Sequence, residues 1–344
     1  MNIYTLKVCK EDDVSLLINF IKNYWNKDHA FVKSKELLRF QHYNPLKKEY
    51  NFILGVNNQT KEIDGIVGLI PLSQYDPELE KYNETWGGIW KVRTDVKNDE
   101  IGILGLLLFE EFHKYNSRGG IGMSTIATMF YKLMKYKICI LDQYYILNNE
   151  CNEFKIASIP LSQKTAAIPL KKERHIIKDI DDISTVQEGS IDAGYWPRKS
   201  LTYLENRFQK HPIYTYQFWG IYDKDLKLKT ILVIRAIEIN NSKAIRIVDV
   251  FGSLSGIGSI KKGLIELLKK ESAEYVDILN FGISPEIFAE LGFEHLDVNG
   301  EIIIPNYFEP FMRKNIVINC GYKAPYNYVM FKGDSDQDRP SIIN

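Results

Sequence analysis

The sequence predicts a mixed α/β protein made of two similar domains. The chain has 344 residues, a length that suits two ordinary domains better than one. Its residues are 45% hydrophobic and 12% aromatic, which is enough apolar material for two cores. A similar order of strands and helices also occurs twice: Tyr216 follows Asn51 by 165 positions (216 − 51), and Ile260 follows Gly102 by 158 (260 − 102).

In the first half, apolar runs and turn residues mark alternating strands and helices. We expect strands at 51–56, 62–72, 86–92, 119–125 and 138–147, and helices at 101–115 and 127–136. An amphipathic helix should precede them over 11–25, because Leu17, Phe20, Ile21 and Trp25 recur at helical spacing.

The second half repeats this order. We expect strands at 216–222, 228–239, 244–250 and 275–282, and helices at 200–212, 260–270 and 285–293. The polar, lysine-containing stretch 148–174 is the natural crossover. This predicts an N-terminal domain at 1–160 and a C-terminal domain at 161–344. Their sheets should be mixed, with parallel and antiparallel strands.

Charge and composition exclude several classes of function. The 44 Lys and Arg balance 44 Asp and Glu, which argues against a nucleic-acid partner. The N-terminus lacks the pattern of a signal peptide, and the longest apolar stretch, 101–109, is too short to span a bilayer. The four cysteines show no metal or redox spacing. We expect a cytoplasmic protein without a membrane or metal requirement, and the sequence leaves its oligomeric state open.

Glycines stand where two helices begin. Gly102 and Gly105 open the helix expected at 101–115, and Gly256 and Gly258 precede the helix expected at 260–270. A helix N-terminus with nearby glycines can hold a phosphate group. Tight strand-to-helix turns would explain the same glycines.

The segment after the first of these helices carries a recognisable spacing. Ser124, Ala127, Tyr131, Lys135 and Tyr136 follow the pattern N-x-x-A-x-x-x-Y-x-x-x-G-F with Ser for Asn, Lys for Gly and Tyr for Phe. With the order of elements, this pattern resembles the GNAT (Gcn5-related) N-acyltransferases. The phosphate loop, 97–102, departs from the family's R-x-x-G-x-G and keeps one cation and one glycine.

This resemblance implies tandem GNAT-like domains that use coenzyme A, as acyl-CoA, as a co-substrate. It places the coenzyme on the N-terminal domain and makes Tyr131 the general acid that protonates the departing thiolate. In the C-terminal domain Phe288 stands where that tyrosine would be, so we expect this domain to bind the acceptor. The coenzyme-binding candidates are Trp90, Val92, Arg93, Ile101, Gly102, Ile103, Leu104, Gly105 and Ser124.

Four further segments, 25–29, 40–42, 304–311 and 332–340, resemble the dTDP-3-amino-3,6-dideoxyhexose N-acyltransferases. That resemblance implies transfer of an acetyl or short hydroxyacyl group, such as 3-hydroxybutanoyl, to a nucleotide-linked amino sugar for surface polysaccharides such as O-antigen. Two alternatives remain. One is a Fem-type tRNA-dependent aminoacyl transferase, disfavoured by the neutral charge and the lack of a long heptad arm. The other is a non-catalytic binding module for acyl-CoA or a sugar nucleotide.

An amino-sugar acceptor needs stacking partners, cations and a proton acceptor. His29 is the candidate base because imidazole titrates near neutral pH, and His42 is the runner-up, although ordered water could serve instead. Arg198, Lys199 and Arg207 could meet a diphosphate, and a solvated helix face would explain them equally. The substrate-binding candidates are Trp25, Gln41, His42, Arg207, Tyr307 and Glu309.

Overall fold

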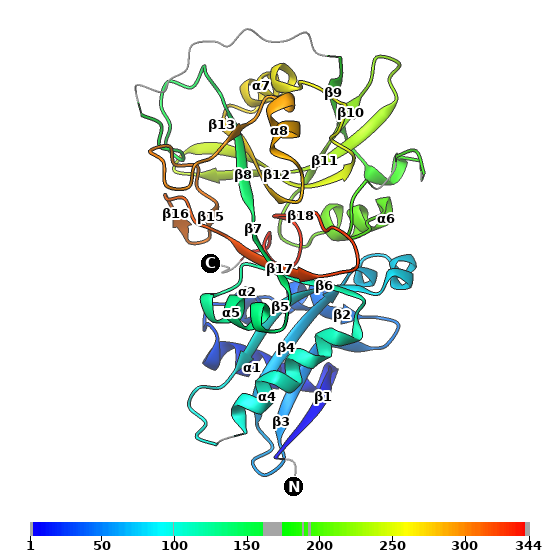
Figure 1. Ribbon diagram of the computed structural model, residues 1–344, viewed down its shortest axis with the longest axis vertical. Coiled ribbons are helices and arrows are strands. Elements are labelled where there is room, and N and C mark those ends of the chain that lie inside the picture. Colours follow the sequence, from blue (N-terminus) through cyan, green and yellow to red (C-terminus); the bar gives the residue numbers. More distant parts are fainter. Residues whose placement is uncertain (1–2, 99, 161–173, 188, 192–193, 341–344) are drawn as a thin grey trace.

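The computed structural model describes residues 3–98, 100–160, 174–187, 189–191 and 194–340. Two large mixed sheets follow one another along the long axis of the molecule (Figure 1). Each sheet contains eight strands, and both parallel and antiparallel pairs occur in each. The expected mixed α/β class is therefore confirmed. The predicted boundary at 160/161 adjoins residues 161–173, which lie outside the described part of the chain.

The first sheet has the order β1-β3-β4-β5-β6-β17-β7, with β2 paired to β3. Its strands are β1 Tyr4–Lys10, β2 Tyr43–Asn44, β3 Glu49–Asn57, β4 Ile63–Pro71, β5 Glu84–Val92, β6 Ser117–Ile121, β17 Asn319–Lys323 and β7 Lys137–Ile140. Its helices are α1 Val14–Tyr24, α2 Ala30–Lys33, α3 Lys35–His42, α4 Ile101–Glu110 and α5 Thr125–Leu133.

Alternate residues of the central strands cover opposite faces of this sheet. Ile66 packs in the core of α1, α2 and α3, whereas its neighbour Val67 packs with Leu104 and Leu108 of α4. Such alternation is what a strand buried on both faces requires. Close contact with α4 explains Gly55, where a Cβ atom would lie 2.4 Å from a methyl group of Leu104.

The second sheet has the order β14-β8-β13-β12-β11-β10-β9, with β18 paired to β13. Its strands are β14 Glu294–His295, β8 Asp142–Leu147, β13 Ala273–Phe281, β12 Ser242–Gly252, β11 Leu228–Ile239, β10 Gln217–Tyr222, β9 Ile176–Ile180 and β18 Met330–Phe331. Helices α6 Leu201–Leu204, α7 Lys261–Lys270 and α8 Pro285–Leu291 accompany it, and a small hairpin joins β15 Tyr307–Phe308 to β16 Phe311–Met312.

The two sheets exchange strands. β8 comes from the first half of the chain but pairs with β13 in the second sheet, and β17 comes from the second half but lies between β6 and β7. Figure 1 shows both crossing the junction. The single strand expected at 138–147 is therefore wrong: it divides at Leu141, a buried residue whose amide donates to the carbonyl of Ile318 at 3.0 Å.

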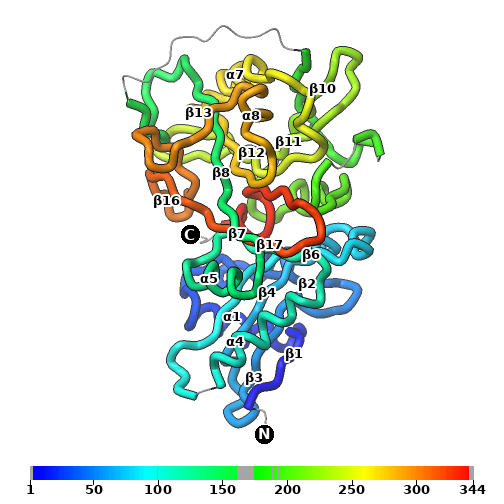
Figure 2. The backbone as a smooth tube through the Cα atoms, in the orientation of Figure 1, coloured from blue at the N-terminus to red at the C-terminus, as the bar shows by residue number. Residues whose placement is uncertain are grey.

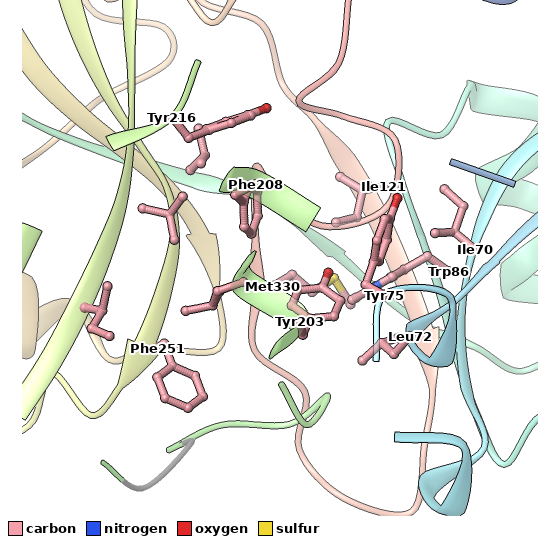
Figure 3. Packing of buried hydrophobic residues seen from close by; sticks show 14 of the residues in the cluster. Ile70, Leu72, Tyr75, Trp86, Ile121, Tyr203, Phe208, Tyr216, Phe251 and Met330 are labelled. Carbon is pink, nitrogen blue, oxygen red and sulfur yellow. The ribbon is translucent and has the colours of Figure 1, made fainter. Parts of the chain in front are cut away.

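A shared apolar core joins the two halves. Figure 3 shows Trp86 and Ile121 of the first sheet close to Tyr203, Phe208 and Met330 of the second half. Buried aromatic side chains dominate this cluster, and their large apolar areas make the junction resemble a domain interior. The two halves therefore pack as one body.

The last described residues run through this junction, where Figure 2 shows them in red between the sheets. Ser335 donates to the carbonyl of Gly87 at 2.6 Å, and Gln337 donates to that of Ile121 at 3.0 Å. On the other side, Asp334 lies 2.8 Å from Lys199, which also binds Asp249 at 2.7 Å. This polar segment, residues 332–340, has the composition of a flexible tail, yet here it is buried and contacts both sheets. We call it the connector.

Removal of the Lys199 charge tests this connector. Lys199→Met leaves Asp249 and Asp334 buried without their cation, so we expect the free energy of unfolding to fall by about 3–5 kcal/mol in urea denaturation. Lys210→Met is the matched control, because its 2.6 Å pair with Glu205 is largely exposed. That control should cost less than about 1 kcal/mol. Equal losses in the two variants would contradict a structural role for the buried cluster.

Candidate active site where two parallel strands separate

β5 and β6 pair in parallel, but the pairing ends before β5 does. Their pairing extends from Glu84 and Ser117 to Gly87 and Gly120, after which β5 continues to Val92 without β6. On its other edge β5 bulges, because Val67 faces Trp90 and Leu69 faces Gly87, so two residues of β5 lie opposite Gly68 alone. A bulge leaves backbone groups outside the ladder, and those groups are available to a ligand.

A cavity of about 260 Å³ opens at this separation. Gly88, the first residue of the bulge, lines it, as do Ile121 and Gly122 at the end of β6. The remaining wall comes from the segment between α1 and α2, from the segment before β10, from β11 and β12, from the β15–β16 hairpin and from the connector that follows β18. Its lining residues there are Trp25, Asn26, His29, Tyr214, Arg235, Arg246, Asn306, Tyr307, Phe308, Glu309, Lys332, Asp336, Gln337, Asp338 and Arg339.

Tyr131 lies on the other side of β6 from this cavity. Its hydroxyl is 2.9 Å from the position that a Cβ atom would take on Gly120, the last β6 residue paired with β5. Phe109 and Tyr136 surround the ring. Burial, with a smaller contribution from Tyr136, raises the pKa of Tyr131 well above its usual range. The phenol is therefore protonated at neutral pH, as a proton donor must be.

The predicted coenzyme-binding residues gather around α4 and the end of β5. Gly102 is in the first turn of α4 with open space where a Cβ atom would be. Trp90 donates to the carbonyl of Gly105 at 3.2 Å and packs on Phe130 of α5. Two of the predicted coenzyme-binding residues bind protein groups instead. Arg93 binds the carboxylates of Asp95, Glu62 and Asp64. Ser124 caps α5 by accepting from the amide of Ala127.

Among the remaining coenzyme candidates, Val92 lies beside Gly105, while Leu104 is fully buried against the sheet. Ile101 is partly buried, and Ile103 is 52% exposed. The glycines of the second half, Gly256 and Gly258, lie in the loop before α7 with positive φ angles of 77° and 71°. They serve as turn residues there.

Phe288, the counterpart of Tyr131 in the second half, is a core residue. It is fully buried and stacks on Tyr144 with ring centroids 4.2 Å apart.

The predicted acceptor residues divide into two groups. Trp25, Tyr307 and Glu309 line the cavity, and Tyr214 donates to Glu309 at 2.6 Å. Gln41, His42 and Arg207 do not line it. They are at most 3% exposed and are held by internal contacts, such as the 3.0 Å contact between His42 Nδ1 and the carbonyl of Leu69.

The cations predicted for a diphosphate are also occupied elsewhere. Lys199 binds Asp249 and Asp334, and Arg207 donates to the carbonyl of Gly333 at 3.3 Å. The amide of Arg198 donates to Glu84 at 3.0 Å.

His29 reaches the cavity, but its surroundings oppose protonation. Nδ1 accepts from the amide of Phe31 at 3.1 Å, and Nε2 lies 3.1 Å from a guanidinium nitrogen of Arg339. Burial, together with the Arg339 charge, lowers the pKa of His29 to about 3. A base that takes up a proton near neutral pH needs a higher pKa. The assignment of His29 as the base stays a prediction that this environment does not favour.

Four cavity cations are not among the predicted site residues: Arg235, Arg246, Lys332 and Arg339. The segment 332–340, which supplies the last two, was singled out only by its resemblance to the amino-sugar acyltransferases. Arg235 and Arg246 lie inside apolar strands, β11 and β12, where a charged residue is rare without a functional or pairing reason. That signal was available. For Lys332 and Arg339 the signal was the charge density of 332–339, which by itself suggests an exposed tail.

The residues the structure describes include no cluster of three or more His, Cys, Asp and Glu side chains arranged to bind a metal ion. No helix in the described ranges has the length and apolarity to cross a membrane.

Lys332 provides a test of the cavity's electrostatics. Burial, reinforced by the Arg246 charge, lowers the pKa of Lys332 to about 7. We expect Lys332→Met to raise the free energy of unfolding at pH 7 by roughly 1 to 4 kcal/mol, because it removes a charge that is costly to bury.

The gain should shrink as pH rises from 7 to 10.5, because the unfolded chain binds more protons there and wild-type stability increases. Lys224→Met in the exposed β10–β11 turn is the control and should change stability by less than about 0.5 kcal/mol. A destabilised Lys332→Met protein across this pH range would contradict the assignment.

No protein-family model matches the chain, and no curated protein matches its sequence. Solved structures do match its fold. A conserved protein of unknown function from Enterococcus faecalis V583, described as a probable N-acyltransferase, has a TM-score of 0.52 at 10% identity, covering 92% of this chain and 71% of the other. A GCN5-related N-acetyltransferase from Anabaena variabilis has a TM-score of 0.53 at 9% identity, covering 93% and 72%. The chain therefore has the fold of the GCN5-related N-acyltransferases, as its sequence predicts.

Proposed function

We propose that the protein is an acyl-CoA-dependent N-acyltransferase that acylates the amino group of a nucleotide-linked amino sugar of the dTDP-3-amino-3,6-dideoxyhexose type. One observation supports the proposed acyl transfer. The cavity reaches Gly88 and Ile121 where β5 and β6 separate, and the Tyr131 hydroxyl lies beside the adjacent Gly120. A thioester in this separation would have an acceptor on one side and a proton donor on the other.

The reaction that follows is direct transfer. The acceptor amine, once it has lost a proton, attacks the thioester carbonyl, and the carbon–sulfur bond breaks as the amide forms. Backbone amides of the Gly88–Ile89 bulge are candidates to stabilise the oxyanion. Tyr131 gives its proton to the departing thiolate, so that the sulfur leaves as a thiol.

The coenzyme is proposed to approach along α4. The N-terminus of this ten-residue helix presents unpaired amides, and Gly102 leaves room for a diphosphate to come close. Exposed apolar side chains on α4 and α5 could accompany the rest of the coenzyme; they are Ile103, Leu106, Leu107, Ile126, Met129 and Leu133. Arg93 and Ser124, which have protein partners, would hold the loop and the helix that border this path.

The acceptor is proposed to occupy the cavity between the halves. Trp25 is 47% exposed at its rim and offers an aromatic face to a base or sugar. Tyr307 offers a second aromatic surface, and Glu309 offers a carboxylate to the acceptor's ammonium or hydroxyl groups. The amino-sugar identity rests on the sequence resemblance of the segments that supply these residues.

Thiol release from acyl-CoA tests this function. Acetyl-CoA and 3-hydroxybutanoyl-CoA should each be assayed against dTDP- and UDP-linked amino sugars. We expect release that depends on one amino sugar. If no amino sugar on the panel stimulates thiol release, the proposed acceptor is contradicted. If calorimetry detects no coenzyme binding, the proposed acyl-CoA-dependent transferase activity is contradicted.

Tyr131→Phe tests the general acid. It should lower kcat by about 10²–10⁴-fold, because the thiolate would leave without a proton from the phenol. Tyr136→Phe is the matched control: it lies in the same aromatic cluster, but its hydroxyl accepts from Arg118 at 3.0 Å. We expect it to keep kcat within a few-fold. Full turnover by Tyr131→Phe would remove the residue from the mechanism.

The pH profile of kcat/KM tests His29. With its pKa lowered to about 3, His29 is neutral throughout the range from 5 to 9, so it should contribute no limb there. His29→Asn should therefore keep the wild-type profile. If the variant loses a limb near pH 6–7, His29 is the base.

A further inference from the structure

The cavity wall contains one cation without a counter-charge. Arg246 binds Asp277 at 2.6 Å, Arg235 binds Asp338 at 3.0 Å, and Arg339 binds Asp336 at 3.1 Å. These three pairs account for every guanidinium group of the cavity. Lys332, which also lines the cavity, forms no hydrogen bond or ion pair with the described residues.

The position of Lys332 makes this isolation costly. The residue is only 3% exposed, and its ammonium nitrogen lies 4.6 Å from the ring centroid of Tyr307. Buried lysines are almost always paired. Burial lowers the pKa of Lys332 to about 7, and the nearby guanidinium groups of Arg246 and Arg235 add repulsion.

The nearby carboxylates are already engaged. Asp338 accepts from the hydroxyl of Tyr216 at 2.7 Å in addition to binding Arg235. Asp336 accepts from Arg339 and, through its other oxygen, from the amide of Gln337 at 3.1 Å. Neither carboxylate forms a hydrogen bond or ion pair with Lys332, which lines the cavity.

We propose that Lys332 binds an anionic oxygen group of the acceptor, a phosphate or a carboxylate, and thereby anchors the acceptor in the cavity that reaches the β5–β6 separation. The acceptor's identity rests on the proposed function, but the anion site does not. An arriving anion gives Lys332 the direct partner that it lacks, since the three guanidinium groups of the wall each bind a carboxylate and Glu309 accepts from the hydroxyl of Tyr214 at 2.6 Å. The buried side-chain oxygen of Asn306, which has no hydrogen-bond donor among the described residues, offers an acceptor for a neighbouring hydroxyl group.

Calorimetry on the full chain without coenzyme tests the anion site. Sulfate stands for a phosphate group and acetate for a carboxylate, each titrated at constant ionic strength set with chloride. We expect the wild-type protein to bind the matching probe and Lys332→Met and Lys332→Gln to bind it at least tenfold more weakly. Lys224→Met, which removes the same charge from an exposed turn, should bind like the wild type.

The proton balance gives a second reading. Both probes are fully ionised at pH 8, so any proton that is taken up from the buffer binds to the protein and not to the probe. Binding should take up roughly one proton per anion at pH 8, measured by comparing buffers of different ionisation enthalpy, because the anion restores the charged form of Lys332. The other titratable or charged groups that face Lys332 are Tyr307, Asp336, Asp338, Arg235 and Arg246.

Equal affinities in wild type and Lys332→Met, or no binding of either probe by the wild type, would overturn the proposal. An acyl-transfer assay distinguishes a failure of the anion site from a failure of the proposed function. Lys332→Met should lower kcat/KM at least tenfold for a nucleotide-linked amino sugar and leave it unchanged for the neutral methyl glycoside of that sugar. Lys332-dependent anion binding without any acyl transfer would overturn the proposed function alone.

Discussion

The structure depends on the burial of a charged segment between two sheets. Residues 330–339 carry three carboxylates, and each meets a cation. Asp334 meets Lys199 and Asp338 meets Arg235, both from other elements, whereas Asp336 meets Arg339 of the same segment. Because a buried charge is costly unless it is paired, the contacts of Asp334 and Asp338 hold this segment against the second half. The same segment reaches β5 and β6 through Ser335 and Gln337.

The exchange of strands between the two sheets forms the junction in which the connector is buried. With β8 in the second sheet and β17 in the first, neither sheet is complete without the other half of the chain. The separation of β5 and β6 therefore opens toward the second half and not toward solvent alone. The fold by itself supplies the strand separation and the Tyr131 hydroxyl beside Gly120, while the second half supplies the polar cavity wall.

Local patterns predicted most of the elements but not their pairing. The strand at 228–239 matches β11, because alternating and β-branched residues are read within a few positions. The division of 138–147 was missed because both pieces are equally apolar, and a change of sheet leaves no mark on the hydrophobic period. Gln41, His42 and Arg207 are polar residues that serve the interior, whereas Lys332 lay in a segment with the composition of a tail. Contacts with residues distant in the sequence decide such cases, such as the 3.3 Å bond from Arg207 to the carbonyl of Gly333, and a sequence does not display them.

We propose that acyl-CoA and the acceptor meet where β5 and β6 separate. A crystal structure of the chain with coenzyme A would test this arrangement. We expect the thiol between Gly88 and Ile121, within reach of the Tyr131 hydroxyl, with the diphosphate near Gly102. Coenzyme bound instead at the loop of Gly256 and Gly258, with the β5–β6 separation empty, would contradict it.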